Sequence, residues 1–208
     1  MAWLRVVTGV VGINLLMLLG SLAGLIVVGL FPALAAGGVL LAELAAGRPS
    51  ERIWSEFWRE WRAGLGRMNL LALPWWLLGA MLLLDLQVAL PSRGGTPGLL
   101  IGLVLVLIAY LAVVFAFFLA VTRRYDDPIG RTWRFLLVAP LLAPLTSAGI
   151  VLVDAFLLAA FTGLSVLLPL AGLALPVLVT GVLADRRLDR LEAQAEDNPS
   201  VDSRATIS

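Results

Sequence analysis

The chain has 208 residues, of which 61% are hydrophobic and only 14% are charged, and its mean hydropathy is +0.99. Because soluble domains carry about 25% charged residues, this composition indicates an integral membrane protein. The formal net charge is only +1, so the overall charge gives no reason to expect a nucleic-acid partner. Cys and His are absent, and all 15 basic residues are Arg. This composition excludes thiolate nucleophiles, His-based zinc sites, Ser-His-Asp triads and Schiff-base lysines, so we expect neither an enzyme nor a bound cofactor or metal.

Residues 6–46 are almost wholly apolar apart from Asn14 and Glu43. As one helix, this segment would be about 60 Å long, twice the hydrocarbon thickness of a bilayer, about 30 Å. Pro32 disfavours helix at the residue before it, so the sequence predicts helices over about 6–28 and 32–46. The second is short for a span, which leaves five or six membrane helices open. A cleaved signal peptide is an alternative for the first segment, but the apolar run of about 25 residues is too long for a signal-peptide core.

Residues 50–62 are strongly charged, lie between apolar segments, and are predicted to form an amphipathic helix. At 100° per residue, one face gathers large apolar residues, whereas the other gathers Arg, Glu and Ser. Indole rings prefer the headgroup level of a membrane, so we expect this helix at the cytoplasmic membrane surface. Packing on a soluble core is the alternative, which the apolar flanks disfavour. The residues expected to contact the membrane interface or to dock a partner are Trp54, Phe57, Trp58, Arg59, Trp61 and Arg62.

Four further apolar segments follow at about 68–90, 98–122, 135–158 and 164–184, and each is long enough to span a bilayer. Pro residues within the last two predict kinks. The predicted fold class is therefore all-α: a polytopic transmembrane helix bundle with five or six membrane helices and one amphipathic cytoplasmic interfacial helix. Residues 1–184 form this single domain. Residues 185–208 form a cytoplasmic tail that begins as an exposed helix and ends in disorder.

The positions of the Arg residues predict the orientation, because cytoplasmic segments of membrane proteins are enriched in basic residues. With six spans, all Arg except Arg93 lie in the cytoplasm, and with five spans Arg5 also moves outside. Both arrangements place the C-terminus in the cytoplasm. The Arg-only, Ala/Leu/Gly-rich usage is typical of a high-GC bacterium, so the expected location is the bacterial cytoplasmic (inner) membrane.

Polar residues within or near the predicted spans are candidate functional positions, namely Asn14, Asp85 and Asp154. A charge at the bilayer centre costs about 2.5–3.5 kcal/mol on insertion scales, so an acidic residue in a span is a functional hypothesis. The two carboxylates could bind a cation, relay a proton or hold a sugar hydroxyl, or simply touch water or cap the backbone. Asn14 is expected to hydrogen-bond across a helix interface.

Two local patterns have structural interpretations. Gly20 and Gly24 form a GxxxG pattern, which permits close approach of two helices, and we favour packing within the chain over a dimer. Glu43 lies near the cytoplasmic end of the helix predicted at 32–46. Its carboxylate is expected to pair with Arg48 or Arg52.

Motifs in the first third of the chain resemble the YesL family of bacterial membrane proteins. They are Asn14-Leu15-Leu16-Met17-Leu18-Leu19-Gly20-Ser21-Leu22, Gly29-Leu30-Phe31-Pro32-Ala33, Gly47, and Phe57-Trp58-x-x-Trp61-Arg62. The match is best over residues 10–70, whereas the Gly-rich helix at 32–46 and the absence of Lys depart from the family. The resemblance implies a small polytopic protein of unknown biochemical activity, often associated with carbohydrate utilisation and sugar uptake. It supplies no catalytic residues to carry over.

Two classes of function follow from these observations. We expect an accessory or interaction protein in the lipid bilayer, which docks on a sugar-uptake permease or another membrane subunit through its aromatic helix and Arg-rich loops. The alternative is a small self-contained transporter of a neutral or proton-coupled solute, which rests on the kinked helices and on Asp85 and Asp154. An intramembrane enzyme has little support, because it would need an Asp pair from widely separated positions.

Overall fold

The structure is a computed structural model that describes residues 2–89, 95–125, 128–164 and 167–196. Within these residues the chain forms helices joined by turns, without strands. The helices are α1 (Ala2–Ala23), α2 (Leu30–Ala45), α3 (Ile53–Ala89), α4 (Gly95–Arg124), α5 (Ile129–Leu142), α6 (Pro144–Gly163), α7 (Leu167–Ala171) and α8 (Ala174–Glu196).

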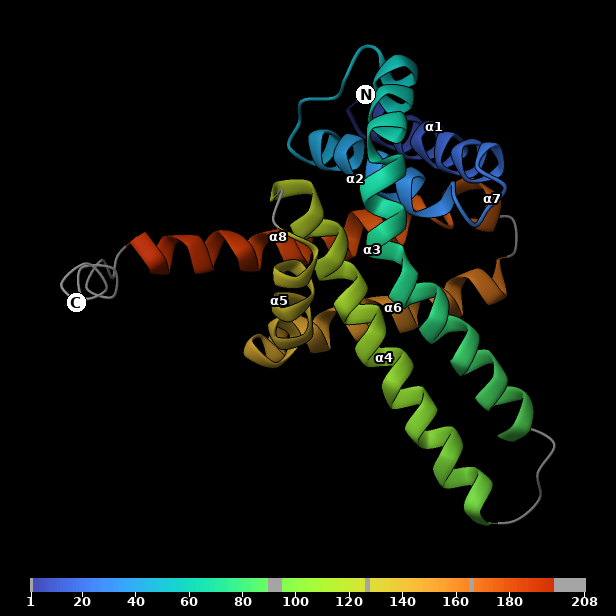
Figure 1. Cartoon of the computed structure of the whole chain (residues 1–208). Coiled ribbons are helices and arrows are strands. Elements are labelled where there is room, and N and C mark those ends of the chain that lie inside the picture. Colours follow the sequence, from blue (N-terminus) through green and yellow to red (C-terminus); the bar gives the residue numbers. More distant parts are fainter. Residues whose placement is uncertain (1, 90–94, 126–127, 165–166, 197–208) are drawn as a thin grey trace.

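Figure 1 shows α1 and α2 side by side as a hairpin at one end of the molecule, against the first half of α3. The second half of α3 and the first half of α4 continue away from the other helices as a long antiparallel pair. The end of α4 returns to the centre, where it meets α2, α5, α6 and α8. Helix α8 begins within the bundle, and its charged second half extends away from it.

Four helical stretches are long and apolar enough to cross a membrane, namely Val6–Ala23, Ile53–Asp85, Ile101–Arg124 and Pro144–Gly163. Helix α2 is apolar but has only 16 residues. At ~1.5 Å per residue it is about 24 Å long, short of a hydrocarbon core of about 30 Å. The predicted all-α fold is therefore confirmed, with four candidate membrane spans. The predicted count of five or six is not, because the other apolar segments are short or divided.

One helix, α3, covers both the interfacial helix predicted at 50–62 and the span predicted at 68–90. Gly64 and Gly66 lie between the two predicted segments, but each glycine weakens a helix by only about 1 kcal/mol. Beyond them, Met68 and Leu71 are buried in the core and hold the helix in place. Pro74 also lies inside α3, which a helix tolerates where packing supports the segments on either side.

The span predicted at 135–158 is instead divided into α5 and α6. The division falls at Ala143, which has φ −134° and ψ 60°. The cause is Pro144, because Pro disfavours helix at the preceding residue and suits the first turn of the next helix. The boundary expected between the segments at 135–158 and 164–184 agrees with the end of α6 at Gly163.

The span predicted at 164–184 is also divided, because α7 ends at Ala171 and α8 begins at Ala174. Helix α8 then continues without a break to Glu196. The apolar end of the predicted span and the charged helix predicted after residue 184 are thus one element. The part of the tail predicted to be disordered lies outside the described residues.

The first three helices interlock through small residues. Phe57 of α3 is fully buried, at 0% exposure, and its Cζ atom would lie 2.9 Å from a Cβ atom added at Gly20 of α1. Gly24 lies directly against the backbone of Gly29. The GxxxG pattern therefore serves packing within the chain, as predicted.

Aromatic rings join α2, α3, α4 and α5 at the centre of the bundle. Ring centroids lie 6.2 Å apart for Phe31 and Phe118, 5.2 Å for Trp75 and Phe115, and 5.8 Å for Trp75 and Trp133. Contacts of this kind contribute about 0.5–1.5 kcal/mol each beyond the area they bury. The cluster fixes the start of α5 against the α3–α4 pair.

Candidate functional site

The aromatic residues predicted to lie on the membrane surface occupy the first turns of α3, and most of them face the bundle. Phe57 is fully buried, while Trp58 and Trp61 are partly buried against the core. Trp54, in contrast, is 61% exposed. The prediction that this whole face lies at the lipid surface is therefore wrong. The small side chains of the α1–α2 hairpin leave room for the rings, so α3 packs on protein there.

Two side chains of α3 fix this helix to the turn between α1 and α2. Trp61 donates its indole N–H to the Gly29 carbonyl at 3.3 Å, and Asn69 donates its amide N–H to the Val28 carbonyl at 3.0 Å. The turn includes Ile26 with φ 64°, which is costly for a β-branched residue. Hydrogen bonds from α3 therefore support a strained turn and satisfy two of its carbonyls.

The opposite side of the first turns of α3 remains open and forms a shallow groove of about 460 Å³. The residues that line this docking groove are Trp54, Ser55, Trp58, Arg59 and Arg62. The indole rings of Trp54 and Trp58 meet edge to face, with centroids 6.0 Å apart. All the lining residues except Ser55 belong to the set predicted from the sequence, so the structure brings an exposed indole and two guanidinium groups together.

Asn14 is fully buried and joins α1 to the break between α7 and α8. Its Nδ2 donates to the Pro169 carbonyl at 2.8 Å. Its Oδ1 accepts from the backbone N–H groups of Leu173 and Ala174, each at 2.9 Å. The predicted hydrogen bonding of Asn14 across a helix interface is confirmed. The Asn14 side chain thus supplies the hydrogen-bond partners that the backbone would otherwise lack where the helix is interrupted.

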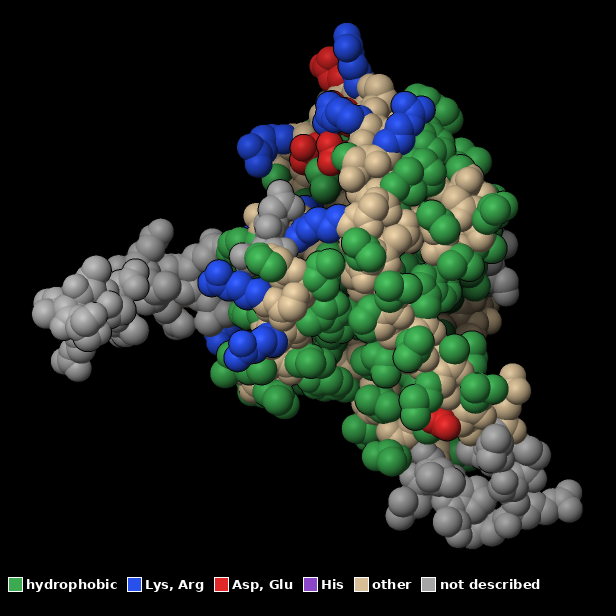
Figure 2. Space-filling view, in the orientation of Figure 1, with side chains coloured by type: hydrophobic (Ala, Val, Ile, Leu, Met, Phe, Trp, Pro, Cys, Tyr) green, Lys and Arg blue, Asp and Glu red, His purple; other side chains and the backbone are tan. Residues whose placement is uncertain are grey.

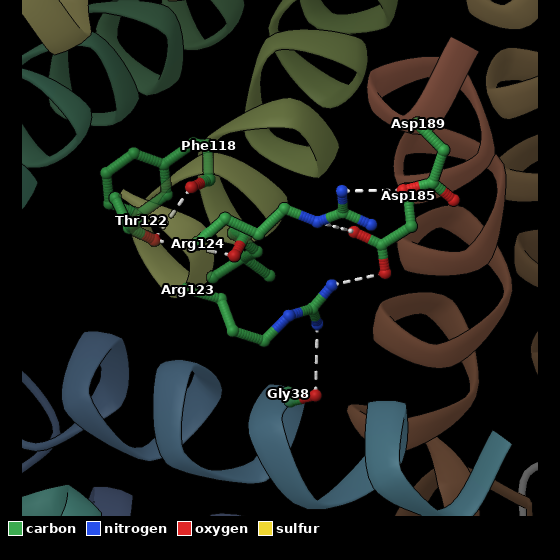
Figure 3. Close-up of polar contacts among 8 residues, drawn as sticks. Gly38, Phe118, Thr122, Arg123, Arg124, Asp185 and Asp189 are labelled. Atoms are coloured by element: carbon green, nitrogen blue, oxygen red, sulfur yellow. Dashed lines mark hydrogen bonds and ion pairs between the residues drawn. The ribbon is translucent and has the colours of Figure 1, made fainter. Parts of the chain in front are cut away.

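A group of arginine and aspartate side chains links the C-terminal end of α4 to the middle of α2 and the middle of α8 (Figure 3). Arg123 donates to the Gly38 carbonyl at 3.0 Å and to the carboxylate of Asp185. Arg124 lies 3.2 Å from the same carboxylate and donates to Asp189 at 2.7 Å. Arg123 and Asp185 are mostly buried, with side chains 13% and 21% exposed. A partly buried, shared carboxylate of this kind ties α8 to α4.

Sequence reasoning missed this network. The sequence predicts Arg123 and Arg124 in a cytoplasmic segment after the span at 98–122, and Asp185 in an exposed tail helix. The signal that could have found it is the spacing of Asp185 and Asp189, which lie on the same face of a helix one turn apart. That face continues the apolar face of α8, where Leu188 is buried, so it points to the bundle.

A cavity of about 360 Å³ lies beside Arg123, between α2, α3 and α4. Its walls are mostly small residues, and its polar lining includes Glu60, Arg67, Thr122 and Arg123. The Thr122 hydroxyl donates to the Phe118 carbonyl at 2.7 Å. The cavity is therefore a recess with both apolar and polar walls beside the basic end of α4.

The acidic candidates remain separate from this network. Asp85 is exposed near the end of α3, and Asp154 is half-buried in the middle of α6. Within the described part of the chain, neither carboxylate has a hydrogen bond or an ion pair, and no group of acidic residues suitable for a metal ion is present. Glu43 likewise forms no ion pair with Arg48, Arg52 or any other described residue, so the predicted pairing is not formed.

The described residues form an all-α bundle in which four helical stretches are long and apolar enough to cross a membrane, and these features are compatible with a polytopic membrane protein. A family model described as a protein of unknown function, DUF624, matches residues 10–86. The matched residues include most of α1, all of α2 and nearly all of α3, and with them Asn14 and the docking groove. No curated protein and no solved structure matches the chain.

Proposed function

We propose that this protein is an accessory component of the bacterial cytoplasmic membrane that docks a partner membrane subunit through the groove on α3. One observation carries the proposal. The first turns of α3 are locked onto the α1–α2 hairpin by Phe57, yet Trp54 stays exposed beside Arg59 and Arg62. Trp and Arg are the residues most enriched at the energetic centres of protein interfaces.

The charge of the docking groove favours an acidic segment of the partner. Arg59 donates to the neighbouring Glu60 at 3.1 Å, but its side chain is 69% exposed. An exposed ion pair contributes only about 0–1 kcal/mol, so Arg59 can exchange Glu60 for a carboxylate of a partner at little cost. Trp54 then supplies apolar contact area next to the charges.

The distribution of arginine supports a cytoplasmic position for this groove. Figure 2 shows Arg side chains gathered over the start of α3 and beside α5, while hydrophobic side chains cover the α3–α4 pair. Since cytoplasmic segments carry the excess of basic residues, the basic end faces the cytoplasm, and so does the C-terminus. The resemblance to the YesL family supports a subunit of a sugar-uptake system, such as its permease, as the partner.

The proposal is tested by co-purification of the tagged full-length protein from native membranes. Reversing the charge in Arg59→Glu is expected to lower partner recovery by about tenfold, because like charges then meet across the contact. Arg134→Glu on α5 makes the same charge change at an exposed position outside the groove and serves as the control. Equal recovery with the two variants would contradict docking through the groove.

A self-contained transporter is the second candidate, and Asp154 favours it. This carboxylate is half-buried within the candidate span Pro144–Gly163 and has no hydrogen-bond or ion-pair partner among the described residues. Such residues often line substrate or proton pathways. Uptake of labelled sugars into proteoliposomes should then fall strongly in Asp154→Asn. Uptake equal to that of the unmodified protein would exclude coupling through this carboxylate.

A further inference from the structure

A second groove lies away from the docking groove, where the start of α1, the end of α2 and the middle of α8 meet. It has a volume of about 380 Å³. Its walls include Val6 of α1, Leu44 and Ala45 of α2, and Leu178 and Val182 of α8. The groove is apolar along its walls apart from one charged lining residue, Arg186.

Leu178, Val182 and Arg186 follow one another at intervals of four residues, so they share one face of α8. This face carries the apolar wall of the groove and a guanidinium group at its end. Arg186 is exposed and has no hydrogen bond or ion pair with any described residue. The neighbouring Arg187 instead donates to the Leu142 carbonyl at 3.2 Å. Arg187 is therefore bound to the protein backbone, whereas the N–H groups of Arg186 in the groove can bind a ligand.

From the position of Arg186 along α8 we infer that its guanidinium group lies at the level of lipid headgroups. It lies at the boundary between the apolar first half of α8 and the charged second half. Such a boundary marks the edge of the hydrocarbon core, and the cytoplasmic leaflet carries anionic lipids that attract Arg. A guanidinium group binds phosphate through two parallel hydrogen bonds.

We propose that this groove binds an anionic phospholipid, with an acyl chain along Leu178 and Val182 and the headgroup phosphate on Arg186. An apolar channel with a single cation at one end matches an amphiphile with a negatively charged head. It does not match a water-soluble anion, which would gain nothing from the apolar walls, or an uncharged lipid, which would leave the guanidinium without a partner. The proposal does not depend on the docking groove of α3.

The test uses the full chain in nanodiscs of phosphatidylcholine that contain a minor fraction of phosphatidylglycerol. Native mass spectrometry after release from the nanodiscs identifies the retained molecules by mass. In the unmodified protein, retained phosphatidylglycerol is expected to exceed its share of the nanodisc lipid. Arg186→Gln should lower this retention by about tenfold, as expected for loss of a charge-assisted contact.

Arg134→Gln is the matched control, because Arg134 is exposed on α5 outside the groove lining and the substitution changes the net charge equally. It should leave retention nearly unchanged. Val182→Trp provides a second variant, which fills the groove without changing the charge and should also release the lipid. Circular dichroism establishes that each variant remains folded.

Three outcomes would overturn the proposal. Equal loss in Arg186→Gln and Arg134→Gln would show that the lipid is attracted to basic residues in general and not to this groove. Unchanged retention in both Arg186→Gln and Val182→Trp would show that the lipid binds elsewhere. A retained mass equal to a second copy of the chain, or to another protein, would assign the groove to a protein partner.

Discussion

Helices α1–α3 and helices α5–α8, which lie on either side of α4 in the sequence, are held in place by different kinds of contact. Helices α1, α2 and the start of α3 interlock through glycines, a buried Phe57 ring and hydrogen bonds to a strained turn. In the second region, only 11% of Pro144–Gly163 is buried, against 39% of Val6–Ala23. Polar bonds from Asn14 and Arg123 hold α8 there. The first region is therefore a packed platform that presents the docking groove, whereas the second combines apolar packing on the centre of the bundle with polar contacts to α1 and α4.

The largest expected effect is at Asn14, because it links the two regions. Asn14→Leu leaves the backbone groups of Pro169, Leu173 and Ala174 without their partners inside the protein. Since each unsatisfied buried group costs about 1–3 kcal/mol and the backbone partly relaxes, we expect a loss of about 3 kcal/mol in the free energy of unfolding. Denaturant titration in detergent micelles measures it.

Thr8→Val is the control for this variant, because it replaces an exposed polar residue on the same helix. It should change the free energy of unfolding by less than about 0.5 kcal/mol. If Asn14→Leu were equally mild, the proposed link between the two regions would be wrong.

The next effect concerns packing within the first region. Gly20→Leu would force a side chain into the space of the Phe57 ring and of Ala33. Overpacking of this kind costs about 1–3 kcal/mol, which the same titration measures. Gly12→Ala, with open space around its Cβ position, should instead stabilise α1 by about 0.5–1 kcal/mol. A double variant that combines Gly20→Ala with Phe57→Leu should lose less than the two single changes added together.

A smaller effect separates the two acidic residues of α8. Asp185 is mostly buried and shared by two guanidinium groups, whereas the Asp189 side chain is 61% exposed. Asp185→Asn should therefore lower the free energy of unfolding by about 1–2 kcal/mol, and Asp189→Asn by less than about 0.5 kcal/mol. Equal effects of the two changes would show that burial does not decide the strength of this network.

The smallest effect on stability is expected at Trp54. Because this ring is 61% exposed, Trp54→Ala should change the free energy of unfolding by no more than about 0.5 kcal/mol. The same change should nevertheless weaken partner recovery in co-purification by about tenfold, as for an interface centre. Full partner recovery with Trp54→Ala would exclude this ring as a docking residue.

The sequence was sufficient for the first region where local signals agree. Pro32 predicted a break between the first two helices, although α1 ends at Ala23 instead of near residue 28 and α2 already begins at Leu30. Gly20 and Gly24 predicted close packing within the chain. The buried role of Phe57 could not be predicted, because an amphipathic helix has the same pattern whether its apolar face meets lipid or protein. The choice depends on the partner surface, which only the folded α1–α2 hairpin supplies.

The second region was harder to predict because its signals depend on tertiary contacts. Pro144 marked a kink, but whether a Pro bends a helix or ends it depends on the packing around it. Asp185 looked solvated in a charged stretch, and its partners come from a distant helix. Asn14 was identified as a bridging residue, yet the sequence could not show that it caps the break before Ala174.

Photo-crosslinking in native membranes tests the central claim most directly. A photoreactive residue is placed at Arg59 in the docking groove and, in a second protein, at Leu152 of α6, which is 70% exposed. Position 59, on the platform of the first region, is expected to capture a membrane subunit, while position 152 is expected to capture mainly lipid. Capture of lipid alone at position 59 would contradict the docking function and would favour a self-contained transporter.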